Sequence, residues 1–454
     1  MPDDRAGLPG AWPDARGGAP RRDPGRGAGA AGLSALWVAP PGQALRLESA
    51  RRRDLPGHPL PIRSQPRDRH DLQRPAGRGL AFVSERLDLV EAVPNFSEGR
   101  RQEVLEAISV AAATPGHVLD LDPDPDHNRA VLTLAGGTVG QAAFAAVERA
   151  VQLIDLGPHA GVHPRVGAAD VLPFVPLGAT PMEACVRLAH EVGELIWREL
   201  RVPVYFYGQA GRHTLPQIRS AAPPPPDLGS APHPTAGFAC VGARPLLVAY
   251  NLLLPGLAVP EAAALARRLR ASSGGLPGVQ ALAFGVTAGA QLSMNLTDLD
   301  ACPPARALAE VVGLAGEAAI GADQVVGLCP ARYGLPAAGG RILEARLAAA
   351  AARAGARACR ARGGEELQLL AARLEAEAAS LAALDWSQGE LLGGAERAAA
   401  LRRVLRAAGI EDPELALMLE VAAGGLRAAL SGPTLNRFRA RVEALDRWLG
   451  SDEL

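Results

Sequence analysis

The sequence predicts an α/β fold: two ferredoxin-like α/β sandwich lobes with a cleft between them, followed by an all-helical segment. Three observations predict it. Strand and helix patterns alternate over residues 89–207, the alternation starts again after a proline-dense connection, and the composition changes to Ala, Leu, Arg and Glu from Arg341 onward. Such alternation is typical of folds in which helices cover one face of a sheet. The 454 residues suffice for two or three domains.

The first lobe is predicted over residues 89–215, in the order β-α-β-β-α-β-α-β. Short apolar runs bounded by Gly, Pro or Asp indicate strands, and apolar residues three and four apart indicate helices. The expected strands are residues 89–93, 118–122, 129–134, 170–174 and 202–207, and the expected helices are residues 102–113, 139–155 and 182–200.

A proline-rich linker is predicted over residues 216–235, and the second lobe over residues 236–333. The expected strands are residues 237–242, 246–254, 279–286, 291–297 and 324–328, and the expected helices are residues 261–272 and 305–319. Two lobes joined by a linker predict a cleft between them, which is the usual place for a small-molecule site.

Residues 334–454 have strong helix propensity. Helices are expected over residues 341–383, 394–409, 413–430 and 433–449, interrupted at glycines such as Gly363 and Gly364. A helical bundle follows from this pattern. The bundle offers no catalytic cluster, so a packing or association role is expected.

Residues 1–88 hold 15 arginines against 10 acidic residues and show no sustained periodicity. Their Arg-, Pro- and Gly-rich composition predicts a disordered extension. Basic excess attracts nucleic acid, but aromatic stacking residues are almost absent, so no nucleic-acid partner is expected. An alternative is that the natural protein starts near Val83, just before the first strand.

The chain contains no lysine, so all 47 basic residues are arginine. This excludes Schiff-base and pyridoxal-phosphate lysines, and the lysines of phosphate loops and kinases. Arginine binds anions but is a poor proton shuttle. Acid–base chemistry near neutral pH therefore falls to the nine histidines, a tuned carboxylate or a cysteine.

The five cysteines are odd in number, scattered, and never form a C-x-x-C pair. Neither a disulfide framework nor a cysteine-rich zinc site is expected, and a reducing cytoplasmic location is predicted. No uninterrupted apolar run is long enough to cross a bilayer, so no membrane association is expected.

Two polar segments are candidates for chemistry. The loop 157–167 carries His159, His163 and Arg165, but its glycines and prolines preclude the helix that a zinc-binding H-x-x-x-H pair needs. A histidine that moves a proton beside an arginine that holds an anion would suit catalysis, and a solvated surface turn is the alternative. The second segment, residues 120–129, is rich in Asp, but its prolines contradict a calcium loop.

Seven blocks occur in order over residues 89–333. They are residues 93–100 (Val-Pro-Asn-Phe-Ser-Glu-Gly-Arg), 122–129 (Asp-Pro-Asp-Pro-Asp-His-Asn-Arg), 161–168 (Gly-Val-His-Pro-Arg-Val-Gly-Ala), 203–207 (Pro-Val-Tyr-Phe-Tyr), 241–245 (Val-Gly-Ala-Arg-Pro), 292–298 (Leu-Ser-Met-Asn-Leu-Thr-Asp) and 325–328 (Val-Val-Gly-Leu). Together they resemble the transferase portion of glutamate formimidoyltransferase, the formiminotransferase family.

The resemblance implies two α/β subdomains, a folate cleft between them and a homodimer. It implies transfer of the formimino group from N-formimino-L-glutamate to N5 of tetrahydrofolate in histidine degradation, with tetrahydrofolate as co-substrate and no metal. The family's catalytic base falls on His163. Its folate-binding stretch falls on Gly229, Ser230, Ala231, Pro232, His233, Pro234, Thr235, Ala236 and Gly237.

The chemistry also fits the residues. A neutral histidine can take the proton from an attacking amine and return it to the departing glutamate nitrogen. Arginine grips carboxylates with two hydrogen bonds, so we expect Arg165 and Arg129 to hold the substrates. Asp122 or Asp126 is the expected partner of the His163 ring. Asn128, beside Arg129, completes the expected substrate-binding residues.

The sequence departs from the family pattern at three places. Val162 stands where the family usually has Glu, and the approach to the folate stretch, residues 226–230, is shortened. Residues 334–454 lack the Pro-Gly-Gly-Gly-Ser-type motif that opens a cyclodeaminase domain, so no deaminase activity is expected. Two alternatives remain: formyl transfer from N-formylglutamate, and a folate-binding protein without turnover.

Overall fold

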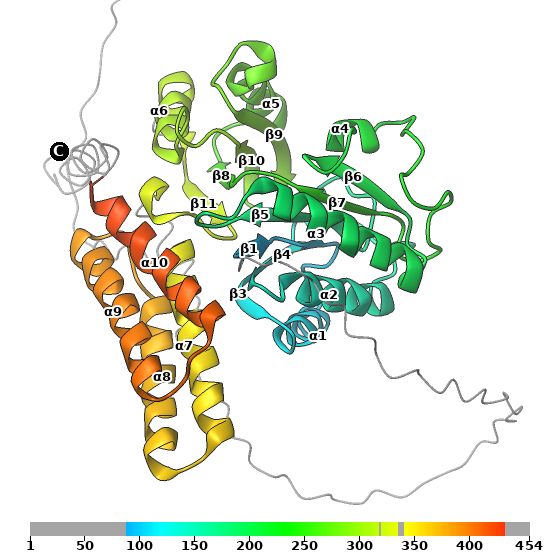
Figure 1. The fold of residues 1–454 in the computed structure, drawn as a ribbon. Coiled ribbons are helices and arrows are strands. Elements are labelled where there is room, and N and C mark those ends of the chain that lie inside the picture. The colour runs from blue at the N-terminus through cyan, green and yellow to red at the C-terminus, as the bar shows by residue number, and fades with distance from the viewer. Residues whose placement is uncertain (1–87, 317–318, 335–339, 432–454) are drawn as a thin grey trace, which may run out of the picture. The chain divides into compact units, whose positions relative to one another are not determined.

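The computed structural model describes residues 88–316, 319–334 and 340–431. All of them belong to one compact unit, which spans Leu80–Leu454 (Figure 1). The predicted extension over residues 1–88 therefore lies outside the described residues, apart from Asp88. The predicted helix over residues 433–449 also lies outside them.

The first lobe contains a seven-stranded sheet. Its strands are β1 (Val90–Ala92), β2 (Asn95–Phe96), β3 (His117–Asp124), β4 (Arg129–Gly136), β5 (Ala169–Pro176), β6 (Val204–Gly208) and β7 (Ala239–Ala243). Strand β4 lies between β3 and the short strands β1 and β2, which in turn pair with β5. Among β1 to β5 all pairings are antiparallel, and this order is the ferredoxin-like arrangement that the sequence predicts.

Strand β7 corrects one expectation. We predicted that the strand at residues 237–242 begins the second lobe, but β7 pairs in parallel with both β5 and β6 in the first sheet. Strand β6 reaches the sheet only through β7. The proline-rich segment therefore returns the chain to the first sheet, and the chain leaves this sheet after Ala243.

Helices α1 (Gln102–Ala113), α2 (Val139–Leu153) and α3 (Met182–Leu195) cover one face of this sheet (Figure 1). A π-helical turn, Ile196–Leu200, extends α3, and the short helix α4 (Leu215–Ile218) follows β6. The side chains of β4 point alternately to the two faces of the sheet. Leu132 and Leu134 pack in the helix-covered core, whereas Val131 and Thr133 line a pocket on the opposite face.

The second lobe is a βαββαβ unit built on a four-stranded antiparallel sheet. Its elements are β8 (Val248–Leu254), α5 (Val259–Leu269), β9 (Val279–Val286), β10 (Gly289–Leu296), α6 (Pro304–Ala315) and β11 (Ala322–Val326). The strand order β11-β8-β10-β9 is again ferredoxin-like. Leu292, Met294 and Leu296 of β10 pack in the core with α5 and α6.

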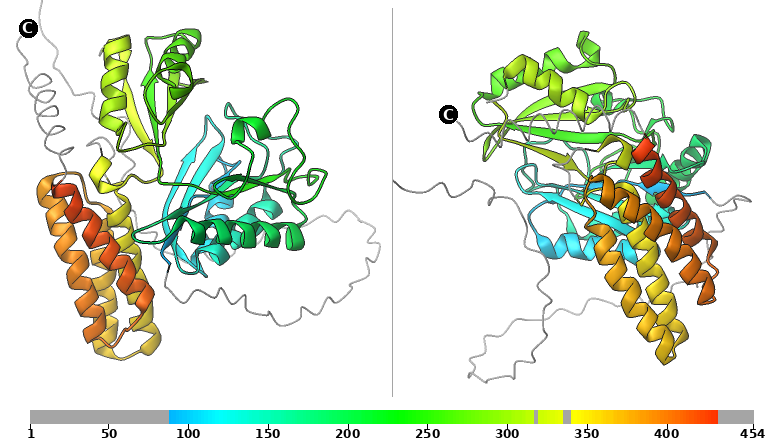
Figure 2. Two further views of the ribbon diagram at one scale, coloured as in Figure 1. Left: turned by 45° about the horizontal axis from the view of Figure 1, so that its top comes forward. Right: turned by 90° about the vertical axis from the view of Figure 1, so that its left-hand side faces the viewer.

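Four described helices form the C-terminal bundle: α7 (Leu343–Arg362), α8 (Glu365–Ala382), α9 (Gln388–Ala407) and α10 (Pro413–Ser431). Figure 2 shows them lying side by side. Small alanines on α7, such as Ala348 and Ala352, are fully buried and allow close helix packing. The bundle shares one hydrophobic core with the second lobe, and the predicted mixed fold with a helical C-terminal segment is confirmed.

Candidate active site

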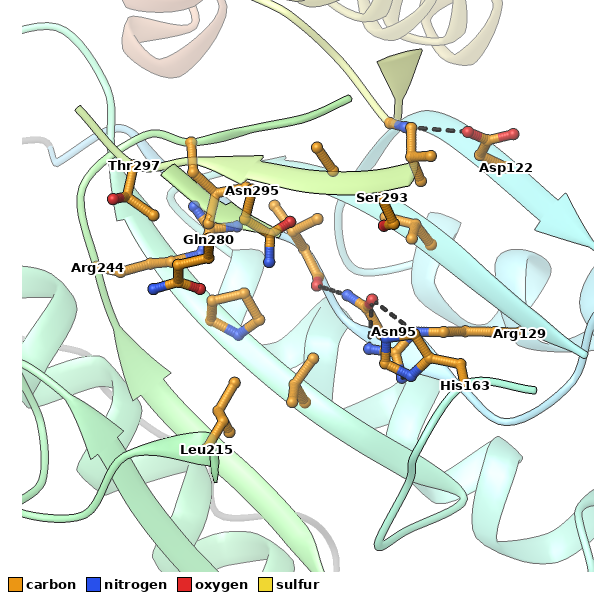
Figure 3. A pocket seen from close by; sticks show the side chains of 18 of the residues that line it. Asn95, Asp122, Arg129, His163, Leu215, Arg244, Gln280, Ser293, Asn295 and Thr297 are labelled. Atoms are coloured by element: carbon orange, nitrogen blue, oxygen red, sulfur yellow. Dashed lines mark hydrogen bonds between the residues drawn. The ribbon is translucent and has the colours of Figure 1, made fainter. Parts of the chain in front are cut away.

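A pocket of about 420 Å³ lies between the helix-free faces of the two sheets. Figure 3 shows side chains from both sheets pointing into it. His163, Arg129 and Asn95 gather at one end, whereas Arg244, Gln280 and Thr297 gather at the other (Figure 3). The cleft predicted between two lobes therefore corresponds to this pocket.

His163 is the histidine of the loop 157–167 that reaches the pocket wall. Its Nδ1 lies 2.7 Å from the carbonyl oxygen of Pro164 and 3.2 Å from a terminal guanidinium nitrogen of Arg129. A carbonyl oxygen can only accept a hydrogen bond and a guanidinium N–H can only donate one, so the two contacts call for opposite tautomers. We assign the ring proton to Nδ1 because the Pro164 contact is the shorter one. This leaves Nε2 with a free lone pair, as a proton acceptor requires.

The His163 ring is neutral at pH 7 in this environment. Burial lowers its pKa to about 3, together with the positive charges of Arg129 and Arg219, while the Pro164 hydrogen bond and Asp170 oppose the shift. A neutral ring is the form that can act as a base.

Asp170, at the start of β5, holds two arginines of the pocket. One of its oxygens lies 2.6 Å from Arg129 and 2.5 Å from Arg219, and the other accepts the backbone N–H of Val166 at 2.7 Å. Although burial opposes it, the two arginines hold the pKa of Asp170 below its usual value. Arg129 and Arg219 together carry one more positive charge than Asp170 neutralises, which suits an anionic ligand.

Arg129 was predicted from the sequence as a substrate-binding residue, whereas Asp170, Arg219 and Arg244 were not predicted to have a role. Arg129 also donates to Asn95 at 2.8 and 3.0 Å, so several contacts fix its position. Asp170 was visible only as the first polar residue of a predicted strand. Arg244 stands in the block 241–245, which was matched to the family without a role for its arginine, and nothing in the local sequence of Arg219 distinguishes it from the many other arginines of this chain.

The second sheet lines the pocket with neutral polar side chains. Ser293 and Asn295 alternate along β10 with its buried apolar residues, and Gln280, Asn251 and Gln324 come from neighbouring strands. The alternation of polar and apolar residues in residues 292–297 was the available signal. Uncharged donors and acceptors suit a polar heterocycle better than a carboxylate.

Residues of the second lobe also cover His163. The ring of Phe284 lies 5.8 Å from the His163 ring and 5.0 Å from the His127 ring. His127 Nε2 lies 2.6 Å from Gln291 Oε1, and this hydrogen bond connects the turn after β3 with β10. These contacts help to exclude water from one side of His163.

Asp122 and Asp126, the predicted carboxylate partners of the His163 ring, form their hydrogen bonds with other residues. Asp122 lines the pocket, but its oxygens accept the backbone N–H of Gly327 at 3.0 Å and a guanidinium N–H of Arg341 at 2.9 Å. Asp126 accepts two hydrogen bonds from Thr287. Both carboxylates are turned toward the second lobe and the segment before the bundle, whereas Asp170 shares Arg129 with His163 and acts on the pKa of its ring.

Arg165 and Asn128 fix the loop instead of reaching the pocket. Arg165 donates to the backbone carbonyls of His127, Asn128 and His163 at 2.9–3.2 Å. The Asn128 side chain accepts from Gly99 and donates to Ala160. The prediction that Arg165 grips a substrate carboxylate is not supported by this geometry, because backbone oxygens occupy its guanidinium.

The stretch 229–237 lies against the base of the His163 loop. The N–H of Ala168 donates to Ala236, and Gly237 forms a bridge with Gly167. None of its nine residues lines the pocket described above. Val162, the departure from the family pattern, is 43% exposed and lies outside the pocket lining.

Within residues 88–316, 319–334 and 340–431, no group of His, Cys, Asp or Glu is placed to hold a metal ion. No helix in the same part of the chain has the length and apolar character needed to cross a membrane.

Comparison with known proteins agrees with this architecture. Residues 89–244 match the N-terminal subdomain of the formiminotransferase domain, and this match ends where the chain leaves β7. The chain is 37% identical over 302 residues to the glutamate formimidoyltransferase of Thermoplasma acidophilum. The aligned region covers 58% of this chain and 99% of that protein.

Two further relatives extend the comparison. The glutamate formimidoyltransferase of Streptococcus pyogenes serotype M1 is 36% identical, over 54% of this chain and 90% of its own length. The formimidoyltransferase-cyclodeaminase of Sus scrofa is 41% identical, over 55% of this chain and 52% of its own length. The chain therefore belongs to the formiminotransferase family of one-carbon transferases.

Proposed function

We propose that this protein is a glutamate formimidoyltransferase, which moves the formimino group from N-formimino-L-glutamate to N5 of tetrahydrofolate, with His163 as the general base. The observation that carries the proposal is the position of His163. The family's base falls on this residue, and its unprotonated Nε2 and neutral ring lie in the wall of the pocket between the lobes.

Attack of the folate amine on the amidine carbon forms a tetrahedral intermediate, and the amine must lose a proton. His163 Nε2 accepts this proton and returns it to the departing glutamate nitrogen. A carboxylate bound beside Arg129 and Arg219 would screen the charges that lower the pKa of His163, so substrate binding would strengthen the base.

The lining supports two kinds of ligand group. Arginines of the first lobe suit the carboxylates of glutamate and folate, and the neutral polar face of the second sheet suits the pterin ring. Among the described residues, the buried Thr133 Oγ1 and Arg219 Nε have no hydrogen-bond partner, and both residues line the pocket. Buried polar atoms are normally paired, so these two atoms are exceptions in the pocket wall.

The wider setting is part of the same proposal: a role in histidine degradation, a cytoplasmic location and a homodimer, all of which the family resemblance implies. The five cysteines are free and buried, which is compatible with a reducing compartment.

The test is release of glutamate from N-formimino-L-glutamate in the presence of tetrahydrofolate, with N-formyl-L-glutamate as the second donor. We expect turnover with the formimino donor. We expect His163→Ala to lower kcat about a hundredfold or more. His159→Ala is the matched control, because His159 lies in the same loop but outside the pocket lining.

Turnover with N-formyl-L-glutamate but not with N-formimino-L-glutamate would show that the donor carries a formyl group and not a formimino group. Tight folate binding without release of glutamate from either donor would favour the non-catalytic folate-binding alternative. Near-normal turnover of His163→Ala would remove His163 from the mechanism.

A further inference from the structure

Two polar side chains on the pocket face of the first sheet have no hydrogen-bond partner: the carboxylate of Glu91 and the hydroxyl of Thr133. Glu91 of β1 is only 4% exposed, and its side chain forms no hydrogen bond or ion pair within the described residues. Its oxygens are not among the fully enclosed unpaired atoms, whereas Thr133 Oγ1 on β4 is. Both residues line the pocket, so the wall holds a carboxylate that the protein itself does not pair.

The neighbouring charged side chains do not satisfy Glu91. Arg244 also lines the pocket, but it is partly exposed, and its guanidinium donates to the carbonyl of Pro245 at 3.0 Å. Glu344 of α7 is an acid itself and accepts the backbone N–H of Ala331 at 2.8 Å. A ligand with N–H donors would therefore meet no competing partner at the Glu91 carboxylate.

The register of the sheet orders the groups along the floor of the pocket. Strands β1 and β2 follow one another between the same two neighbours, β4 and β5. Asn95, which accepts from Arg129 beside His163, lies at one end of this line. Glu91 lies four residues away, a distance of about 13 Å along a strand. Thr133 of β4 lies between the residues that pair with Asn95 and with Glu91.

Gly327 borders the pocket beside the Thr133 hydroxyl. Its φ is +73°, and a Cβ atom there would lie 3.8 Å from Thr133 Oγ1 and 3.6 Å from Val131 Cγ1. Asp122 holds the backbone N–H of Gly327 at 3.0 Å. A side chain at position 327 would thus take up pocket space next to this hydroxyl, and glycine leaves that space to a ligand.

The pterin of tetrahydrofolate presents matching groups in the same order. One ring carries N5, the reacting nitrogen. The other ring carries the C4 carbonyl, then N3–H, then the 2-amino group, in order of increasing separation from N5 along the ring. N3–H and the 2-amino group are two parallel donors, and a carboxylate accepts two parallel donors. With N5 at His163, the carbonyl points toward Thr133 and the two donors point toward Glu91.

We propose that Glu91 recognises the pterin edge of tetrahydrofolate by accepting hydrogen bonds from N3–H and the 2-amino group, while Thr133 donates its hydroxyl to the C4 carbonyl oxygen. The proposal rests on the proposed function for its ligand and names the residues that select that ligand. A buried carboxylate without donors is costly, and the pterin supplies two. A heterocycle without this pair of donors leaves Glu91 unpaired, so Glu91 determines specificity.

The experiment is titration calorimetry of the full chain without oxygen at pH 8, with tetrahydrofolate and with its analogue in which a methyl group replaces the 2-amino group. Burial raises the pKa of Glu91 to about 7, so the carboxylate is mainly ionised at pH 8. We expect the wild type to bind tetrahydrofolate about tenfold to a hundredfold more tightly than the analogue, the usual effect of a hydrogen bond to a charged group. This comparison needs no variant.

Two variants assign the contacts. Glu91→Gln keeps the shape but places a donor where an acceptor is needed, so tetrahydrofolate should bind about tenfold to a hundredfold more weakly, and the analogue less than about threefold more weakly. Thr133→Val should weaken both ligands alike, by about fivefold, because both keep the C4 carbonyl. Neither variant should change the affinity for N-formimino-L-glutamate. A thermal melt of each variant checks that it is folded.

Glu103→Gln is the matched control, since Glu103 is an exposed carboxylate of α1 outside the pocket lining. It should bind both folates as the wild type does. Equal affinities of the wild type for the two folates, or an equal loss for both in Glu91→Gln, would overturn the role of Glu91. Continued release of glutamate would then leave the proposed function intact. Absence of tetrahydrofolate binding, with no glutamate release from either donor, would refute the proposed function and this inference with it.

Discussion

At the residue scale, the chemistry of His163 depends on its burial and on three neighbouring residues. The Pro164 carbonyl accepts the proton on Nδ1, and burial together with the charges of Arg129 and Arg219 keeps the ring neutral. The arginines are themselves held by Asp170, so the carboxylate acts on the histidine through the cations and not by a direct hydrogen bond. An Asp–His pair, as the sequence suggested, would have the opposite effect and raise the pKa of the ring.

This low pKa has a consequence for stability that can be measured. The unfolded chain protonates His163 near pH 6.5, whereas the folded chain does so only near pH 3. Stability linked to this residue is therefore complete above pH 6.5 and is lost as the pH falls. Between pH 7 and pH 5 the wild type should lose about 2 kcal/mol more than His163→Gln, measured by urea unfolding. Equal losses would show that the ring is protonated normally in the fold.

At the element scale, the loop 157–167 is placed by close backbone packing. A Cβ atom at Gly161 would lie 2.4 Å from the carbonyl oxygen of His127 and 2.5 Å from the Arg165 guanidinium. The loop can approach the turn after β3 only because residue 161 has no side chain. Arg165, which looked like a substrate clamp, is part of this anchorage.

Gly161→Ala should therefore displace His163 and lower kcat by about tenfold to a hundredfold, since small misplacements of a catalytic group are costly. Gly157→Ala is the control, because the nearest atom to a Cβ there is the Asp155 side chain at 3.2 Å. Glutamate release and a thermal melt are measured for both. Unchanged kcat in Gly161→Ala would mean that the loop tolerates displacement.

Most elements were predictable because their signals are local. The helix expected over residues 102–113 and the strand expected over residues 279–286 match α1 and β9. The sheet membership of β7 was not, because its hydrogen-bond partners β5 and β6 are far away in the sequence. Similarly, His163, Arg129 and Arg244 all stand in recognisable motifs, but that Arg244 lines the pocket follows only from the position of β7 in the first sheet.

At the scale of the whole molecule, Asp122 connects the two lobes and the segment leading into the bundle. It accepts the N–H of Gly327, which follows β11, and it pairs at 2.8 Å with Arg341, which precedes α7. Arg341 also pairs with Asp120 at 3.1 Å. Because Asp122 lines the pocket, the helical segment is linked to the pocket wall by a buried ion-pair cluster.

Arg341→Gln should destabilise the protein by about 3 kcal/mol at pH 8, because it leaves the buried Asp122 without its cation and Asp120 with Arg346 alone, at 3.6 Å. Burial already raises the pKa of Asp120, and removal of Arg341 raises it further, so the loss should be smaller at pH 5, where the carboxyl can remain protonated. Urea unfolding of the full chain at the two pH values measures this. Arg360→Gln is the control, since its pair with Glu375 is exposed on the bundle and should change little. A loss that is equal at both pH values, or equal in the control, would show that the cluster does not hold the helical segment to the lobes.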